Sequence, residues 1–104
     1  MASGNIIVIA TDHNGIKQKQ FICNKLSKDY RIIDLGPHDD LNKVDYTDFS
    51  SQLSKIISSK QADLGILICG TGVGMSIVSN KYKNVRAALV HNFISAINSK
   101  EHND

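Results

Sequence analysis

Short apolar runs without a polar face alternate along this chain with segments of helical periodicity. The first run, NIIVIA at residues 5–10, is rich in β-branched side chains, which is typical of a fully buried parallel strand. Similar runs follow at RIIDLG (31–36), LGILIC (64–69) and VRAALV (85–90). We therefore expect these four segments to form strands of one sheet.

Between the runs, apolar residues recur three and four positions apart, as in helices that pack one face. Such faces are formed by Ile22, Cys23 and Leu26 within residues 16–28, by Phe49, Leu53, Ile56 and Ile57 in a helix opened by Thr47 and Asp48, and by Ile94 and Ile97 in a short last helix. A further helix begins within the glycine segment that follows residue 69. Strict strand–helix alternation predicts an α/β fold with a parallel sheet and helices on both faces.

Length and charge restrict the class of protein. A chain of 104 residues is large enough for a single domain, which we place at residues 1–104. The net charge is only +2 and the basic residues are scattered, so we expect no nucleic-acid partner. The opening MASGNIIVIA lacks a basic segment and its apolar run is too short to span a membrane, which favours a cytoplasmic location.

Three glycines, Gly70, Gly72 and Gly74, alternate where the third strand passes into a helix. Glycine lets the backbone approach a ligand, and the N–H groups of a helix N-terminus attract anions. The third glycine of a dinucleotide fingerprint is replaced by Ile77, and a P-loop ending is missing, which argues against nucleotides and a flavin. The segment predicts an anion-binding turn, with a plain strand-to-helix turn as the second interpretation.

Cys69 ends the strand directly before these glycines. A thiol near a helix N-terminus has a lowered pKa and can act as a base or nucleophile, although a small buried hydrophobe is the other interpretation. Cys23 falls on the apolar face of a helix and is predicted to be a core residue. The two cysteines lack metal-type spacing, and we expect no disulfide between them.

Asp12 and His13 follow the first strand, at the same sheet edge as Cys69, where α/β sheets bind ligands. They offer an acceptor and a titratable donor for a sugar hydroxyl and a phosphate. Alternatively, Asp12 caps the next helix and His13 is an exposed loop residue. His102 follows the last short helix near the chain end. The polar loop with His38, Asp39, Asp40 and Asp45 lacks metal-ligand spacing, so we predict no metal site.

The motifs ATDHNG, VDYTDFS, GILICGTGVGMSIVSNK, VRAALVH and SKEHND together resemble the type B ribose-5-phosphate isomerases, within the wider family that includes the galactose-6-phosphate isomerase subunits. The resemblance covers essentially the whole chain. It implies a Rossmann-like three-layer sandwich and a homodimer with sites between subunits. It also implies the cofactor-free interconversion of ribose 5-phosphate and ribulose 5-phosphate through an enediolate, a step of the non-oxidative pentose phosphate pathway.

The resemblance also implies roles for individual residues. Cys69 would be the base that moves a proton between C1 and C2, and His102 the acid that opens the furanose ring. Thr71 would be the third catalytic residue and would contribute its hydroxyl. The implied substrate-binding residues are Asp12, His13, Tyr46, Gly70, Thr71, Gly72, Val73, Gly74 and Asn103. In such a reaction, preorganised N–H donors stabilise the negative charge that develops on oxygen.

The largest departure from the family lies at the end of the chain. Family members continue beyond EHND with a fifth strand and a C-terminal helix that carries phosphate-binding arginines, whereas this chain stops at Asp104. Its only arginines, Arg31 and Arg86, lie in predicted strands without a match to that motif. We expect a C-terminally incomplete domain with weak activity or none. A galactose-6-phosphate-type subunit and a non-catalytic sugar-phosphate-binding remnant are the alternatives.

Overall fold

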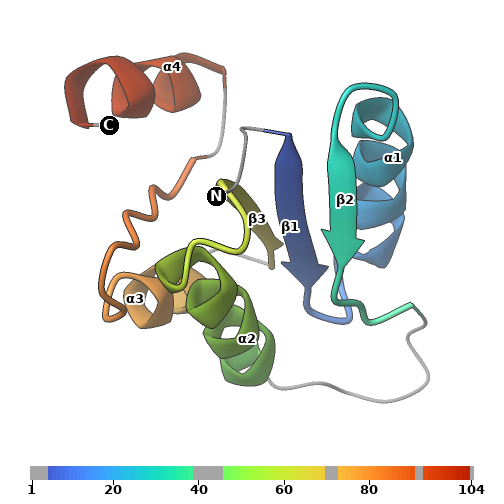
Figure 1. Cartoon of the computed structure of the whole chain (residues 1–104), viewed down its shortest axis with the longest axis horizontal. Helices are drawn as coiled ribbons and strands as arrows, with labels where there is room; N and C mark the ends of the chain where they lie inside the picture. The colour runs from blue at the N-terminus through green and yellow to red at the C-terminus, as the bar shows by residue number, and fades with distance from the viewer. Residues whose placement is uncertain (1–4, 39–45, 70–72, 91–92, 104) are drawn as a thin grey trace.

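The computed structural model describes residues 5–38, 46–69, 73–90 and 93–103 (Figure 1). Three strands and four helices lie in these ranges. They are β1 (Ile6–Thr11), α1 (Ile16–Leu26), β2 (Arg31–Asp34), α2 (Tyr46–Ser58), β3 (Leu64–Ile68), α3 (Val73–Ser79) and α4 (Phe93–Asn103). None of the helices in the described ranges is long and apolar enough to cross a membrane.

The sheet is parallel throughout, with the order β2-β1-β3. Val8 of the central strand lies opposite Ile33 of β2 and Gly65 of β3. Helix α1 packs on β1 and β2, while α2 packs on β1, β3 and α3 (Figure 1). The predicted α/β fold with a parallel sheet is therefore confirmed.

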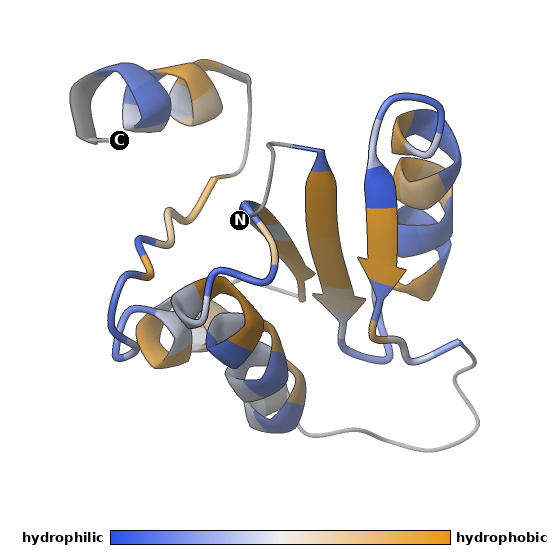
Figure 2. Ribbon diagram, viewed as in Figure 1, coloured by the Kyte–Doolittle hydropathy of each residue, from blue (hydrophilic) through white to orange (hydrophobic). Residues whose placement is uncertain are grey.

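The core is centred on β1, because this strand has a neighbour on each edge and a helix over each face. Val8 and Ala10 are buried together with Leu53 of α2 and with Ala62. The alternate residues Ile7 and Ile9 point to the other face of the sheet and are also buried. Figure 2 shows β1 as a continuous apolar ribbon at the centre of the molecule. A strand that is apolar on both faces is the pattern expected at this position.

The prediction of a strand at residues 85–90 is wrong, because this segment has no regular secondary structure. The backbone of Ala87 forms two hydrogen bonds with the side chain of Asn80. The Asn80 amide donates to the Ala87 carbonyl at 2.9 Å, and the Ala87 N–H donates to Asn80 Oδ1 at 2.8 Å. These backbone groups are thus satisfied without a neighbouring strand. Within the described residues β3 is an edge strand, and its Leu64 is 52% exposed.

The last helix is longer than the sequence pattern indicated. Helix α4 begins at Phe93 and continues to Asn103, so EHN lies in its final turn and does not follow it. The apolar spacing of Ile94 and Ile97 marked only the first two turns. Ile94 is 70% exposed, so burial of this side chain does not explain the helix.

Candidate functional site

The carboxyl ends of β1 and β3 are tied together at one backbone carbonyl. The Ile68 carbonyl accepts a hydrogen bond from the Thr11 hydroxyl at 3.0 Å and another from the Asp12 N–H at 3.0 Å. Cys69 is the next residue along the chain. The structure therefore brings Cys69 and the turn that begins at Asp12 to the same edge of the sheet, as predicted.

A compact turn carries Asp12 and His13 from β1 into α1. Asp12 Oδ1 accepts a hydrogen bond from the Asn14 N–H at 2.9 Å, and the Gly15 N–H donates to the Asp12 carbonyl at 3.3 Å. Gly15 is the N-cap of α1, and no side chain caps this helix. The alternative that Asp12 caps the helix is therefore wrong: its carboxylate orders the turn instead.

Gly15 allows α1 to start directly against the sheet. A Cβ at this position would collide with the Thr11 hydroxyl and would lie 2.6 Å from Cγ2 of Ile68. Any larger residue must displace one of the two strand ends that hold the turn. The close approach of α1 thus contributes to the placement of Asp12 and His13.

His13 is half-buried and borders a cavity of about 670 Å³. Cys69 and His38 lie on the walls of the same cavity. The Nδ1 atom of His13 is buried and has no hydrogen-bond partner among the described residues. A buried polar atom without a partner favours a bound polar group or water at this position. The cavity is therefore suited to a polar ligand beside Cys69.

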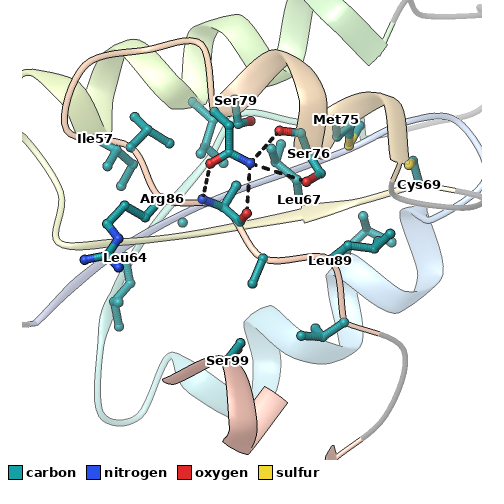
Figure 3. Close-up of a pocket in the computed structure, with 18 of the residues that line it drawn as sticks. Ile57, Leu64, Leu67, Cys69, Met75, Ser76, Ser79, Arg86, Leu89 and Ser99 are labelled. Atoms are coloured by element: carbon teal, nitrogen blue, oxygen red, sulfur yellow. Dashed lines mark hydrogen bonds between the residues drawn. The ribbon is translucent and has the colours of Figure 1, made fainter. Parts of the chain in front are cut away.

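Cys69 lies between this cavity and a larger one of about 1050 Å³. The larger cavity has Leu67 of β3, Met75 of α3 and Ser99 of α4 on its walls, and Figure 3 shows Cys69 at its edge near Met75. Cys69 is half-buried and forms no disulfide. Its position directly after β3, on the walls of both cavities, is compatible with a reactive group.

Cys23 has a different environment. It lies on α1, with its Sγ atom 4.0 Å from Asp34 Oδ2. Burial and the negative charge of Asp34 raise the pKa of the Cys23 thiol, and the nearby Lys19 only partly opposes this. A raised pKa keeps the thiol protonated at neutral pH and makes it a poor base or nucleophile. Of the two cysteines, Cys69 is the candidate for chemistry.

A buried ion pair beside the site was missed by the sequence analysis. Lys19 is fully buried, and its Nζ atom lies 2.8 Å and 2.6 Å from the two carboxylate oxygens of Asp34. The available signal was spacing, because Lys19 stands on the same helical stripe as Ile22, Cys23 and Leu26. A lysine on an apolar stripe requires a buried partner.

Several predicted site residues lie outside the described residues or are described only as backbone. Gly70, Thr71 and Gly72 lie outside the described ranges, whereas Val73 and Gly74 form the first turn of α3. Tyr46 opens α2, and His102 and Asn103 lie in the last turn of α4. The roles of these residues remain predictions. No group of three or more metal-binding side chains occurs in the part of the chain that the structure describes.

Comparison with known proteins identifies relatives of this fold. The family model for Ribose/Galactose Isomerase matches residues 7–104. Ribose-5-phosphate isomerase B of Escherichia coli is 35% identical over 99 residues, which are 94% of this chain and 66% of that protein. The Clostridium thermocellum ribose-5-phosphate isomerase B structure has a TM-score of 0.88 at 42% identity, with 94% of this chain and 66% of that chain covered.

The structure of ribose-5-phosphate isomerase B from Mycoplasma genitalium, solved with bound ribulose-5-phosphate, has a TM-score of 0.85 at 40% identity. The match covers 93% of this chain and 65% of that chain. This chain thus spans about two thirds of the length of these relatives. The matches confirm the family resemblance that the sequence motifs predicted.

Proposed function

Because the chain belongs to the ribose/galactose isomerase family, we propose that it interconverts ribose 5-phosphate and ribulose 5-phosphate through an enediolate. The observation that carries this proposal is the placement of Cys69 beside the Asp12–His13 turn, through two hydrogen bonds to the carbonyl of Ile68. The relative from Mycoplasma genitalium was solved with ribulose-5-phosphate, the ketose of this pair. A sugar phosphate is therefore the proposed substrate.

In the proposed reaction, Cys69 acts as the base that removes the proton from C2 of the open-chain aldose and returns it to C1. Negative charge develops on the carbonyl oxygen as the enediolate forms, and the proton of the C2 hydroxyl moves to the C1 oxygen to leave a ketone at C2. The backbone N–H groups of residues 70–74 would stabilise that charge. Each preorganised donor of this kind lowers a barrier by about 3 kcal/mol.

The remaining groups would prepare and hold the substrate. His102 would open the furanose ring, Asn103 would bind a hydroxyl, and Asp12 with His13 would hold the other end of the sugar. Support for His102 comes from α4, because its last turn contains His102 and Ser99 of the same helix borders the cavity that Cys69 borders. We further propose Tyr46 as a pocket residue, Thr71 as a hydroxyl donor, and a cytoplasmic homodimer with sites between subunits.

A pair of cysteine variants tests the proposal. Turnover of ribose 5-phosphate should fall about 1000-fold in Cys69→Ala, since a positioned general base contributes roughly 100- to 10,000-fold. Cys23→Ala is the matched control and should keep turnover within about twofold, because its thiol stays protonated at neutral pH. Equal turnover of Cys69→Ala and the wild type would rule out Cys69 as the base. Galactose 6-phosphate, assayed in parallel, would reveal a hexose phosphate preference.

A further inference from the structure

Lys19 is among the largest fully buried side chains of the described residues, and it is charged. Its ammonium group contacts both carboxylate oxygens of Asp34, at 2.8 Å and 2.6 Å. The Asp34 side chain is 28% exposed, so the desolvation cost falls mainly on Lys19. Well-packed apolar residues often stabilise a protein as well as an ion pair of this kind does. Stability alone is therefore a weak reason for this pair, and its other contacts indicate what it does.

The Asp34 carboxylate also holds the backbone of the loop after β2. Its Oδ1 atom accepts a hydrogen bond from the Gly36 N–H at 2.8 Å, and Gly36 has a φ of +92°. The Gly36 carbonyl in turn accepts a hydrogen bond from the Thr11 N–H at 3.1 Å. Lys19 orients the carboxylate, the carboxylate orients Gly36, and Gly36 contacts the end of β1.

The same series of contacts continues to the site. Thr11, held by Gly36, donates its hydroxyl to the Ile68 carbonyl directly before Cys69. In the other direction, His38 follows Gly36 by two residues and borders the cavity that also contains His13 and Cys69. The Nδ1 atom of His38 lies 3.8 Å from Asp34 Oδ2. Two walls of the cavity therefore depend on the position of one carboxylate.

We propose that Lys19 and Asp34 are positioning residues for the substrate site. The pair fixes the loop that carries His38 as one wall of the cavity, and it holds Thr11 where the Asp12–His13 turn meets Cys69. Neither Lys19 nor Asp34 borders the cavity, so the pair acts through Gly36 and Thr11 and through the contact of Asp34 with His38. This inference rests on the proposed function insofar as the cavity binds the sugar phosphate.

Two double variants separate positioning from stability. Lys19→Met/Asp34→Asn removes both charges but keeps an oxygen that accepts from the Gly36 N–H. Lys19→Met/Asp34→Leu removes the charges and the acceptor, while apolar side chains fill the space. Replacement of an ion pair by apolar residues of similar volume is often neutral or stabilising, and the Asn variant keeps the hydrogen bond to the Gly36 N–H. We therefore expect both proteins to fold and to melt within a few degrees of each other.

The site should respond differently in the two proteins. The Asn double variant should keep the KM for ribose 5-phosphate within about threefold of the wild type. The Leu double variant should raise KM by about tenfold or more with a smaller change in kcat, because the displaced residues His13 and His38 border the binding cavity, and a misplacement costs up to about 100-fold. If Lys19 and Asp34 contributed only to stability, the two double variants would have equal KM values, and that result would overturn the proposal.

Amide hydrogen exchange provides a readout that needs no isomerase activity. Exchange at Gly36 and Thr11 should become about tenfold faster in the Leu double variant and stay unchanged in the Asn double variant. Lys25→Met, the same substitution at an exposed position of α1, should change neither exchange nor KM. If the wild type fails to isomerise ribose 5-phosphate, the proposed function is wrong. The exchange rates alone then test the positioning role of Lys19 and Asp34, and equal rates in the two double variants would overturn that role.

Discussion

The two sides of the central strand are organised differently. On the β2 side, the ion pair between Lys19 and Asp34 and the hydrogen bonds of Gly36 hold helix, strand and loop together. On the β3 side, apolar side chains remain in contact with solvent, among them Leu64 at 52% and Ile77 at 55% exposure. Phe21 of α1 is also 62% exposed, but most of the exposed large apolar side chains among the described residues lie on the β3 side.

This difference bears on the candidate site, which lies where the two sides meet. On the β2 side, the Asp12 and Asp34 carboxylates accept hydrogen bonds from backbone N–H groups, so the turn at Asp12 and the loop at His38 are held by interactions present in the structure. On the β3 side, the described residues leave β3 at the edge of the sheet. Beside Cys69, the end of β3 is held by two hydrogen bonds to the Ile68 carbonyl, one from the Thr11 hydroxyl and one from the Asp12 N–H.

The largest effect should come from the glycine at the start of α1. Gly15→Ala would place a Cβ against the Thr11 hydroxyl and 2.6 Å from Cγ2 of Ile68, at the point where both strand ends are anchored. Overpacking of this kind costs about 1–3 kcal/mol. Thermal melting should show the loss of stability, and ribose 5-phosphate turnover should fall as well, because the Asp12–His13 turn must move.

Gly65→Ala is the matched control on the β3 side. Its Cβ would lie 2.6 Å from Cδ2 of Leu53, the far end of a flexible side chain. Leu53 can change its rotamer, so the melting temperature should fall less than in Gly15→Ala and turnover should change little. Equal losses in the two variants would contradict the view that the close approach of α1 supports the site.

The next effect concerns the segment that replaces the expected fourth strand. Asn80→Ala removes both hydrogen bonds with Ala87 and the hydrogen bond from the Asn80 amide to the Ser76 carbonyl at 2.9 Å, drawn as dashed lines in Figure 3. Because Asn80 is exposed, we expect a loss of about 1 kcal/mol in the free energy of unfolding. Urea denaturation of the variant and the wild type measures this loss.

Asn80→Asp tests the same contact more finely. It keeps the acceptor for the Ala87 N–H but loses the donor to the Ala87 and Ser76 carbonyls and sets a carboxylate oxygen against both, so its loss should be at least as large as that of the alanine variant. If both variants are as stable as the wild type, then Asn80 does not hold residues 85–90, and the β3 side depends on other contacts.

The sequence predicted the parallel sheet and the edge that carries the site because these follow from local patterns. The run at β1 is apolar on both faces, and the order of strands and helices leaves few arrangements for a parallel sheet. The same reasoning placed Asp12 and Cys69 at one edge. Such conclusions need only periodicity and chain order, both of which are complete in the sequence.

The errors arose where long-range partners decide the structure. Residues 85–90 read as a buried strand, but a short apolar run forms a strand only if a neighbour offers its backbone groups. Lys19 was missed because its burial depends on Asp34, which is 15 positions away in sequence. The length of α4 was missed because EHN carries no apolar spacing, so only backbone geometry reveals that the helix continues.

A smaller effect is expected at the exposed edge strand. Leu64→Thr should change the free energy of unfolding by no more than about 0.5 kcal/mol, as is usual for exposed positions. It should also reduce the binding of a dye that is fluorescent on apolar surface. Ile9→Thr, in the buried centre of β1, is the contrasting control and should lower stability several-fold more. A large loss of stability in Leu64→Thr would show that the β3 edge is covered in solution.

The smallest effect should be a pH dependence of stability that originates from Cys23. Burial and the charge of Asp34 raise the pKa of its thiol above the ordinary value of 9.0, so the folded chain keeps this proton at a pH where the unfolded chain releases it. The unfolded state then binds fewer protons, and stability declines as the pH rises. The contribution of Cys23 to the free energy of unfolding is fully present below about pH 9, and it is lost as the pH rises through the higher pKa of the folded state.

Cys23→Ala isolates this contribution, because all other titrating groups are shared with the wild type. Between about pH 8 and pH 10.5, the wild type should lose slightly more stability to urea than the variant does, in the direction set by the raised pKa of the thiol. Cys69→Ala serves as the comparison on the other side of the sheet. If the wild type and Cys23→Ala lose stability in parallel over this range, the thiol has the same pKa in both states, and the β2 side is more open to solvent than its contacts indicate.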